Sequence, residues 1–102
     1  MKSQRSWRAH MDFWVYILRC SDGSYYIGHT DKGDDRLKEH EIGLGSSYTR
    51  KRRPVTLVWS DRFGTREEAL AAERQLKGWS RAKKEALIKG NWSRLQLLSR
   101  HM

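Results

Sequence analysis

One carboxylate stands where a helix predicts apolar side chains. On a helix that begins at Thr65, Glu73 falls inside the apolar arc when positions are placed at about 100° per residue. A carboxylate that faces a protein core needs a cation, a metal ion or strong hydrogen bonds, because an unpaired buried charge is costly. The alternative is a glutamate at the edge of the arc whose carboxylate reaches water. The apolar residues of the arc are Ala69, Leu70, Ala72 and Leu76.

Arg36 and His40 form a second pair of residues suited to chemistry. They are four positions apart, so they share one face of a helix. A guanidinium fork suits a phosphate group, and an imidazole suits proton transfer or a phosphate contact. The alternative is an ordinary exposed helix surface.

Two tyrosines flank an Asp-Gly turn in "WVYILRCSDGSYYIGHT" (residues 14–30), and the length of that turn decides whether they meet. A two-residue turn puts Tyr16 and Tyr26 on opposite faces of the hairpin. A three-residue turn, with Gly23 in the left-handed conformation, puts both tyrosines on one face, about 7–8 Å apart at Cα. It also pairs Tyr16 with Gly28, which leaves space opposite the phenol. The residues alone permit either register.

Three strands and several helices would position these side chains. Thr65 and Glu68 form a capping box at a helix start, and Pro54 can enter a strand only at its start or edge. The order indicates an α/β domain of the α+β kind with a small, mainly antiparallel sheet. Strands are expected at 13–20, 24–30 and 54–60, helices at 31–43, 65–77 and 80–89, a loop at 44–53, and one or two helical turns after Gly90.

Composition limits the class of protein. The 102 residues suit one domain, with a flexible basic arm at 1–11, a folded domain at 12–93 and a tail at 94–102. No apolar run approaches the roughly 20 residues of a membrane span. A lone cysteine, Cys20, cannot form an intrachain disulfide, which suits a cytoplasmic location. The net charge of +9 favours a polyanionic partner, above all nucleic acid.

Taken in order, these residues resemble the GIY-YIG nuclease domain over residues 12–93. "VYI" at 15–17 corresponds to the first tripeptide of that family, without its glycine, and "YIG" at 26–28 is the second. The similarity is greatest to small single-domain bacterial members, which share a "YT-R" loop like that at 48–50 and an "LKGW" stretch like that at 76–79. Gly33 and Asp35 depart from the family pattern. The other matching positions are Thr30, Arg36, His40, Glu73 and Asn91.

The resemblance implies a three-stranded antiparallel sheet flanked by helices and the hydrolysis of DNA phosphodiester bonds. It implies one divalent ion, Mg²⁺ or Mn²⁺, held by Glu73. It also implies that both tyrosines face one site, and therefore the three-residue turn. Tyr16 would be the general base, with His40 as the alternative, and Arg36 would clamp the scissile phosphate. Tyr26 would contact the phosphate or orient the water, and Asn91 would position the phosphate or Glu73.

The charge and the resemblance together point to a function on nucleic acid. A metal-dependent DNA endonuclease is the function we expect; the alternative is a DNA- or RNA-binding module on a nuclease fold, inactive without a partner. A protein partner or a homodimer is compatible with the sequence.

The tryptophans expected in the core are Trp59, Trp79 and Trp92. The cations expected to follow the nucleic-acid backbone without reading its sequence are Arg50, Lys51, Arg52, Arg53, Arg81, Lys83, Lys84 and Lys89.

Overall fold

The sheet contains three antiparallel strands in the order β2-β1-β3. The computed structural model describes residues 12–99, so the arm expected at 1–11 lies outside the described residues. The central strand β1 is buried from Trp14 to Leu18 because helices cover both faces of the sheet. This fold is the α+β arrangement that the sequence predicted. The strands are β1 (Phe13–Arg19), β2 (Tyr25–Thr30) and β3 (Thr56–Phe63).

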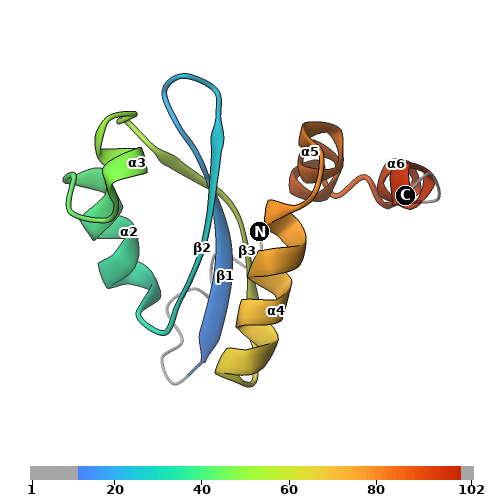
Figure 1. Cartoon of the computed structure of the whole chain (residues 1–102), viewed down its shortest axis with the longest axis horizontal. Coiled ribbons are helices and arrows are strands. Elements are labelled where there is room, and N and C mark those ends of the chain that lie inside the picture. Colours follow the sequence, from blue (N-terminus) through green and yellow to red (C-terminus); the bar gives the residue numbers. More distant parts are fainter. Residues whose placement is uncertain (1–11, 100–102) are drawn as a thin grey trace.

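The helices lie on both sides of this sheet. Figure 1 shows α2 and α3 on one side, α4 and α5 on the other, and α6 beyond α5. Within residues 12–99, no helix combines the length and apolar character needed to cross a membrane. The helices are α2 (Gly33–Glu41), α3 (Ser47–Arg50), α4 (Arg66–Lys77), α5 (Arg81–Lys89) and α6 (Trp92–Ser99).

The hairpin adopts the three-residue turn. Tyr16 pairs with Gly28, Leu18 pairs with Tyr26, and Gly23 has a φ of +85°. One face of the sheet therefore carries Trp14, Tyr16, Leu18 and Tyr26 toward α2 and α3. On the opposite face, a larger apolar cluster joins Val15, Ile17 and Ile27 of the sheet to Ala69 and Leu76 of α4 and Leu87 of α5.

The segment expected to be a loop at 44–53 contains the short helix α3. Ser46 caps that helix, because its side-chain oxygen accepts a hydrogen bond from Thr49 N at 3.1 Å. The third strand begins at Thr56 rather than Pro54 and continues to Phe63 rather than residue 60. Thr65 caps α4, with its Oγ1 accepting from Glu68 N at 3.1 Å, but the Glu68 carboxylate accepts from Gly64 N at 3.2 Å and not from Thr65 N, so only half of the expected capping box is formed.

Trp92 is not a core residue, contrary to expectation. Trp59 and Trp79 pack against the larger apolar cluster, but Trp92 is 64% exposed. Its helix, α6, packs on α5 rather than on the sheet, and Leu95 is the α6 residue that reaches the cluster. A tryptophan in the first turn of such a peripheral helix has no layer to cover it.

Candidate active site

Tyr16 and Tyr26 meet on the face of the sheet that α2 covers. Their ring centroids are 6.4 Å apart, and Tyr16 is 2% exposed. A Cβ on Gly28 would lie 2.5 Å from Tyr16 Oη, so the phenol occupies the space that the glycine leaves. The absence of a side chain at this position is therefore what lets the phenol lie across β2.

The hydroxyl of Tyr16 lies between His40 and Arg36. Its oxygen is 2.9 Å from His40 Nε2, and the nearby Arg36 side chain lowers the pKa of the same hydroxyl. His40 is completely buried and packs by its ring against Tyr26, with centroids 5.0 Å apart. The two candidate bases of the sequence analysis thus form one hydrogen-bonded pair, with a cation beside it.

Burial keeps this pair uncharged in the free protein. Burial raises the pKa of Tyr16 to about 12, although hydrogen bonding to Arg36 lowers it in part. Burial, with the nearby Arg36 charge, lowers the pKa of His40 to about 4. Tyr16 is therefore a phenol and His40 a neutral imidazole near pH 7.

The buried neutral His40 predicts a loss of stability in acid. An unfolded histidine binds a proton below about pH 6.5, whereas folded His40 does so only below about pH 4. The free energy of unfolding should therefore fall as the pH drops from 6.5 to 4, by up to about 3 kcal/mol, and then level off for this group. Urea unfolding between pH 4.5 and 7.5 measures the slope.

A His40→Gln variant provides the control for this prediction, because it should lack that part of the slope. The charged groups that act on His40 are Arg36, which lowers its pKa, and Glu39, which raises it. An identical slope in His40→Gln would contradict the buried neutral imidazole.

Arg36 is a half-buried, permanently charged donor at the mouth of the site. Burial lowers its pKa, but hydrogen bonds to Glu39 and Tyr16 more than compensate, so that pKa is raised. Its Nη1 donates to Glu39 Oε1 at 2.9 Å, one helical turn along α2. The guanidinium is therefore held beside Tyr16 by side chains rather than lying free on the helix surface.

Glu73 lies on α4, against the face of the sheet opposite Tyr16, and is paired. Its side chain is 12% exposed, with Oε1 at 2.5 Å from His29 Nδ1 and Oε2 at 2.7 Å from Lys77 Nζ. Burial raises the pKa of Glu73, and the bonds from Lys77 and His29 outweigh it, so that pKa lies below its usual range. The carboxylate in the apolar arc is thus an ionised group with partners.

His29 was not singled out in the sequence. Its signal is the two-residue alternation of β2, because His29 follows Ile27 by two positions and Ile27 packs toward α4. The three-residue turn therefore puts His29 on the same face as Glu73.

The donor chemistry at Glu73 fits a magnesium-type ion. Within residues 12–99, no three His, Cys, Asp or Glu side chains come together as a metal-binding group. One carboxylate is nevertheless sufficient when water and phosphate oxygens supply the other ligands, which is the usual pattern for Mg²⁺. Glu73 is the side chain that would hold such an ion, in exchange for its contacts with His29 and Lys77.

A hollow of about 190 Å³ lies along β2 next to this site. Tyr48 of α3 stacks on Tyr26, with centroids 6.1 Å apart, and so forms the wall on the α3 side. Two cations, Lys77 and Lys84, line the opposite wall. The full lining is Tyr25, Tyr26, Ile27, Tyr48, Lys77 and Lys84.

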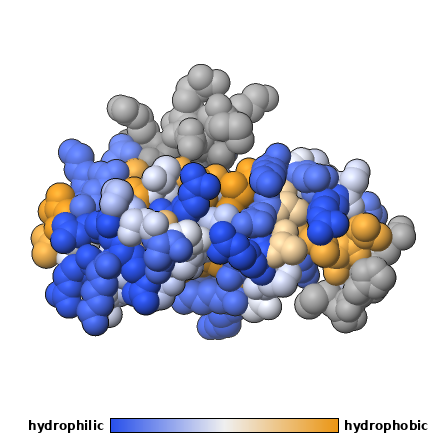
Figure 2. Space-filling model, turned by 90° about the horizontal axis from the view of Figure 1, so that it is seen from above, coloured by the Kyte–Doolittle hydropathy of each residue, from blue (hydrophilic) through white to orange (hydrophobic). Residues whose placement is uncertain are grey.

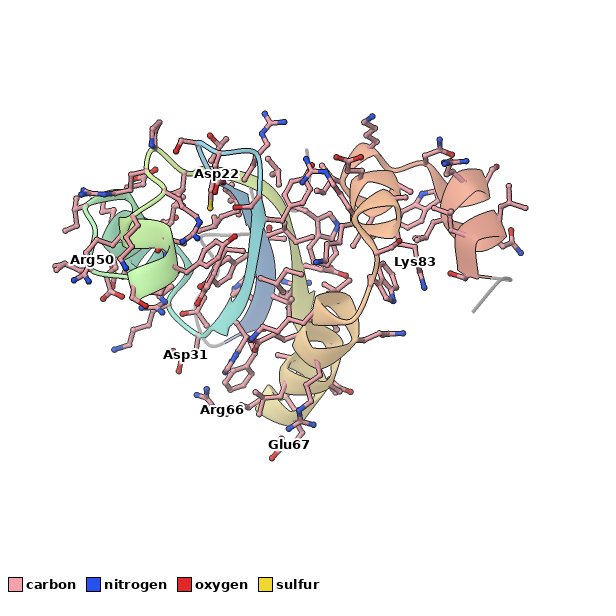
Figure 3. The ribbon with its side chains drawn as sticks, turned by 45° about the horizontal axis from the view of Figure 1, so that its top comes forward. Asp22, Asp31, Arg50, Arg66, Glu67 and Lys83 are labelled. Carbon is pink, nitrogen blue, oxygen red and sulfur yellow. The ribbon has the colours of Figure 1, made fainter. Side chains whose placement is uncertain are left out.

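The four basic residues at 50–53, at the end of α3 and after it, differ in exposure. Arg50, Lys51 and Arg53 are exposed, and Figure 3 shows Arg50 on the outer side of α3. Arg52 lies over the Tyr48 ring at 3.7 Å, and its Nε is 3.1 Å from Asp22 Oδ2 at the hairpin tip. Arg52 therefore joins the loop to the hairpin.

Two other predicted residues lie away from the paired tyrosines. Lys83 is 4% exposed, with its ammonium 4.6 Å from the centre of a Trp79 ring (Figure 3 shows its position on α5). Asn91 is exposed at the start of α6, where its Oδ1 accepts a hydrogen bond from Arg94 N at 3.1 Å. The structure thus gives Lys83 a packing contact and Asn91 a capping contact.

The face of the molecule seen from above is mainly hydrophilic. Figure 2 shows polar side chains over most of this face, with apolar side chains at its two ends and in smaller patches between them. The large exposed apolar residues are Ile42 and Leu44 after α2, Tyr48 on α3, and Trp92 and Leu97 on α6.

Comparison with known proteins gives one consistent result. The family model of the GIY-YIG catalytic domain matches residues 12–86. A UPF0213 protein of Natronomonas pharaonis is 44% identical over 76% of this chain and 91% of its own. A UPF0213 protein of Streptococcus pneumoniae is 44% identical over 79% of this chain and 82% of its own.

Two solved structures are similar as well. The solution NMR structure of a UPF0213 protein from Bacillus halodurans has a TM-score of 0.52 and 47% identity, covering 78% of this chain and 84% of that one. The solution NMR structure of a protein from E. faecalis has a TM-score of 0.56 and 43% identity, with the same two coverages.

Proposed function

The chain belongs to the GIY-YIG catalytic-domain family, a nuclease family, and from that premise we propose that it is a metal-dependent endonuclease acting on DNA. The observation that carries the proposal is the buried Tyr16–His40 pair with Arg36 beside it. Phosphodiester hydrolysis requires a proton acceptor for water and positive charge near the phosphate. This arrangement supplies both at one point.

Tyr16 and His40 together provide a path for the proton. The phenol alone is a weak base at neutral pH, because its pKa is about 12 and its oxygen holds a proton. When Tyr16 Oη passes that proton to His40 Nε2, 2.9 Å away, the same oxygen can take a proton from the attacking water. The water oxygen then forms its bond to phosphorus, the bond to the leaving oxygen breaks, and solvent protonates that oxygen.

The low pKa of His40 ties this transfer to substrate binding. In the free protein, burial and the Arg36 charge both oppose a protonated imidazole. A phosphate group bound by Arg36 compensates the guanidinium charge and adds a negative charge of its own, so both changes favour the imidazolium. Substrate binding therefore raises the pKa of His40 toward the range in which the imidazole can accept a proton.

The remaining site residues bind and neutralise charge. Arg36 would bind the scissile phosphate with its fork and stabilise the charge that develops on it. Tyr26 would donate a hydrogen bond to the phosphate or orient the water. Glu73 would hold a divalent ion, Mg²⁺ or Mn²⁺, which when bound supplies positive charge to the phosphate and the leaving oxygen. Asn91 receives no chemical role, because its side chain caps α6.

Contacts with the nucleic-acid backbone would come from cations at the rim of the site. We place them at the two lysines of the hollow, Lys77 and Lys84, and at the exposed loop residues Arg50, Lys51 and Arg53. Such contacts give salt-dependent affinity without sequence specificity. Lys83 is left out because it is buried against Trp79, and Arg52 because it bridges the Tyr48 ring and Asp22.

The test is conversion of supercoiled plasmid to nicked and linear forms, with and without Mg²⁺ or Mn²⁺. An Arg36→Lys variant keeps the charge but loses the bidentate fork, so its rate should fall about 10²-fold. Arg74→Lys is the matched control on α4, where Arg74 is exposed, and its rate should equal that of wild type.

Parallel reactions with branched DNA and with RNA identify the substrate class. Metal-independent cutting by the purified protein would contradict the proposed mechanism. Salt-dependent DNA binding without any cutting would replace the endonuclease with a binding module.

A further inference from the structure

Two hydroxyl side chains lie behind His40, on the side away from Tyr16. Thr49 Oγ1 is 2.8 Å from His40 Nδ1, and Ser46 Oγ is 2.9 Å from Thr49 Oγ1. Thr49 is completely buried, and both hydroxyls belong to the capped first turn of α3. A chain of side chains therefore runs from Tyr16 through His40 to Ser46.

The direction of each hydrogen bond follows from what its members can donate. The Ser46 carbonyl can only accept, so at that contact the Thr49 hydroxyl is the donor and its oxygen keeps a lone pair for His40 Nδ1. A neutral imidazole that donates from Nδ1 carries no proton on Nε2. That nitrogen, 2.9 Å from Tyr16 Oη, can then accept the phenol proton.

Ser46 allows the Thr49 hydroxyl to accept that bond. The Thr49 proton has two acceptors on Ser46, the side-chain oxygen at 2.9 Å and the main-chain carbonyl at 3.4 Å. With its own proton directed to Ser46, Thr49 Oγ1 presents a lone pair to His40 Nδ1–H. Ser46, the capping residue of α3, therefore determines the direction of the hydrogen bonds that run from Tyr16 through His40 and Thr49.

The packing around His40 holds the ring in this orientation. A Cβ on Gly45 would overlap the His40 ring, so the glycine backbone lies directly against the imidazole. Tyr16 and Tyr26 contact the ring at centroid distances of 5.7 and 5.0 Å. A flip of the ring would turn Cδ2 toward Thr49 and Cε1 toward Tyr16, and both hydrogen bonds of the imidazole would be lost.

We propose that Thr49 is a positioning residue that holds His40 as the Nδ1–H tautomer and so leaves Nε2 ready to accept the Tyr16 proton. The use of this tautomer in catalysis rests on the proposed endonuclease function. The opposite tautomer would donate from Nε2 to Tyr16 and block the proton path. Helix α3 thereby contributes to the chemistry without touching the substrate.

The test reads the tautomer directly from the ¹⁵N chemical shifts of the histidine side chains at pH 7, where His40 is neutral. In the wild type, Nδ1 of His40 should be protonated and Nε2 unprotonated. Thr49→Val keeps the shape of the side chain but removes the acceptor, and it should shift His40 toward the Nε2–H form. Thr49→Ser should retain the wild-type tautomer.

Cleavage kinetics give the second readout. Thr49→Val should lower kcat about 10- to 100-fold with KM changed less than about threefold, and Thr49→Ser should restore most of kcat. Circular dichroism verifies that each variant is folded. An Nε2–H tautomer in the wild type, or a Thr49→Val protein with unchanged tautomer and kcat, would overturn the proposal. The NMR result does not depend on cleavage, so a wild type that cuts nothing would contradict the endonuclease function separately.

Discussion

Replacing Tyr16 with phenylalanine is expected to reduce the cleavage rate by about 10³-fold or more, because it removes the oxygen through which the water proton passes. The substitution leaves the ring in place across Gly28, so the shape of the site is kept. Affinity for DNA should change less than about threefold, since the cations at the rim supply most of it. Plasmid nicking under single-turnover conditions measures the rate, and fluorescence anisotropy measures the affinity.

The matched control is Tyr25→Phe. Tyr25 lies on β2, and its side chain points to the face of the sheet opposite Tyr16. The Tyr25 hydroxyl donates to Glu85 of α5 at 3.1 Å, so its loss costs stability without touching the proton path. Each substitution should lower the free energy of unfolding by about 1–2 kcal/mol, since each removes a hydroxyl that is hydrogen-bonded in the folded protein. Near-wild-type cleavage by Tyr16→Phe would assign the base to His40 alone or to solvent.

The hairpin register shows what the sequence could and could not determine. Asp22-Gly23 is compatible with turns of two or three residues, and a slip of one position turns every β2 side chain to the other face. In the folded protein, Ile27 pairs with Ile17 over the larger apolar cluster, while Tyr26 lies beside Tyr16. Burial of the whole β2 pattern therefore selects the register, which local turn chemistry leaves open.

The supporting residues of the site were harder to predict than the chemical ones. Tyr16, Arg36 and His40 could be proposed from side-chain type and spacing, and the structure brings them together. Thr49 lies on a helix of four residues, too short for any hydrophobic period to reveal it. The sequence signal for Thr49 is local. Ser46 is a typical capping residue, and Thr49 stands three positions later, where the capped N–H belongs.

Contacts between helix and sheet could not be predicted from one helix. The apolar arc of α4 identified Glu73 as unusual, but the arc contains no information about the strand that it faces. His29 comes from β2, 44 positions earlier in the chain. The partner of a buried carboxylate depends on strand register and helix placement together, and both are set by tertiary packing.

Replacing Glu73 with glutamine is expected to abolish metal-dependent cleavage, with a loss of about 10³-fold or more, because it removes the charge that would hold the divalent ion. Glutamine has the same shape, so the side chain can still reach β2. Its neutral amide would leave the Lys77 ammonium without its carboxylate partner, which further disfavours a second cation at this place. Mn²⁺ binding followed by electron paramagnetic resonance should weaken at least about tenfold.

Glu67→Gln is the control for this change, since Glu67 is an exposed glutamate in the first turn of the same helix (Figure 3). It removes the same charge from α4 and should leave both Mn²⁺ affinity and cleavage unchanged. Equal Mn²⁺ binding by Glu73→Gln and wild type would show that the ion is held elsewhere. Unchanged Mn²⁺ affinity together with lost cleavage would instead make Glu73 a partner of Lys77 and His29 that orders the edge of the site, so the two measurements separate a metal ligand from a structural carboxylate.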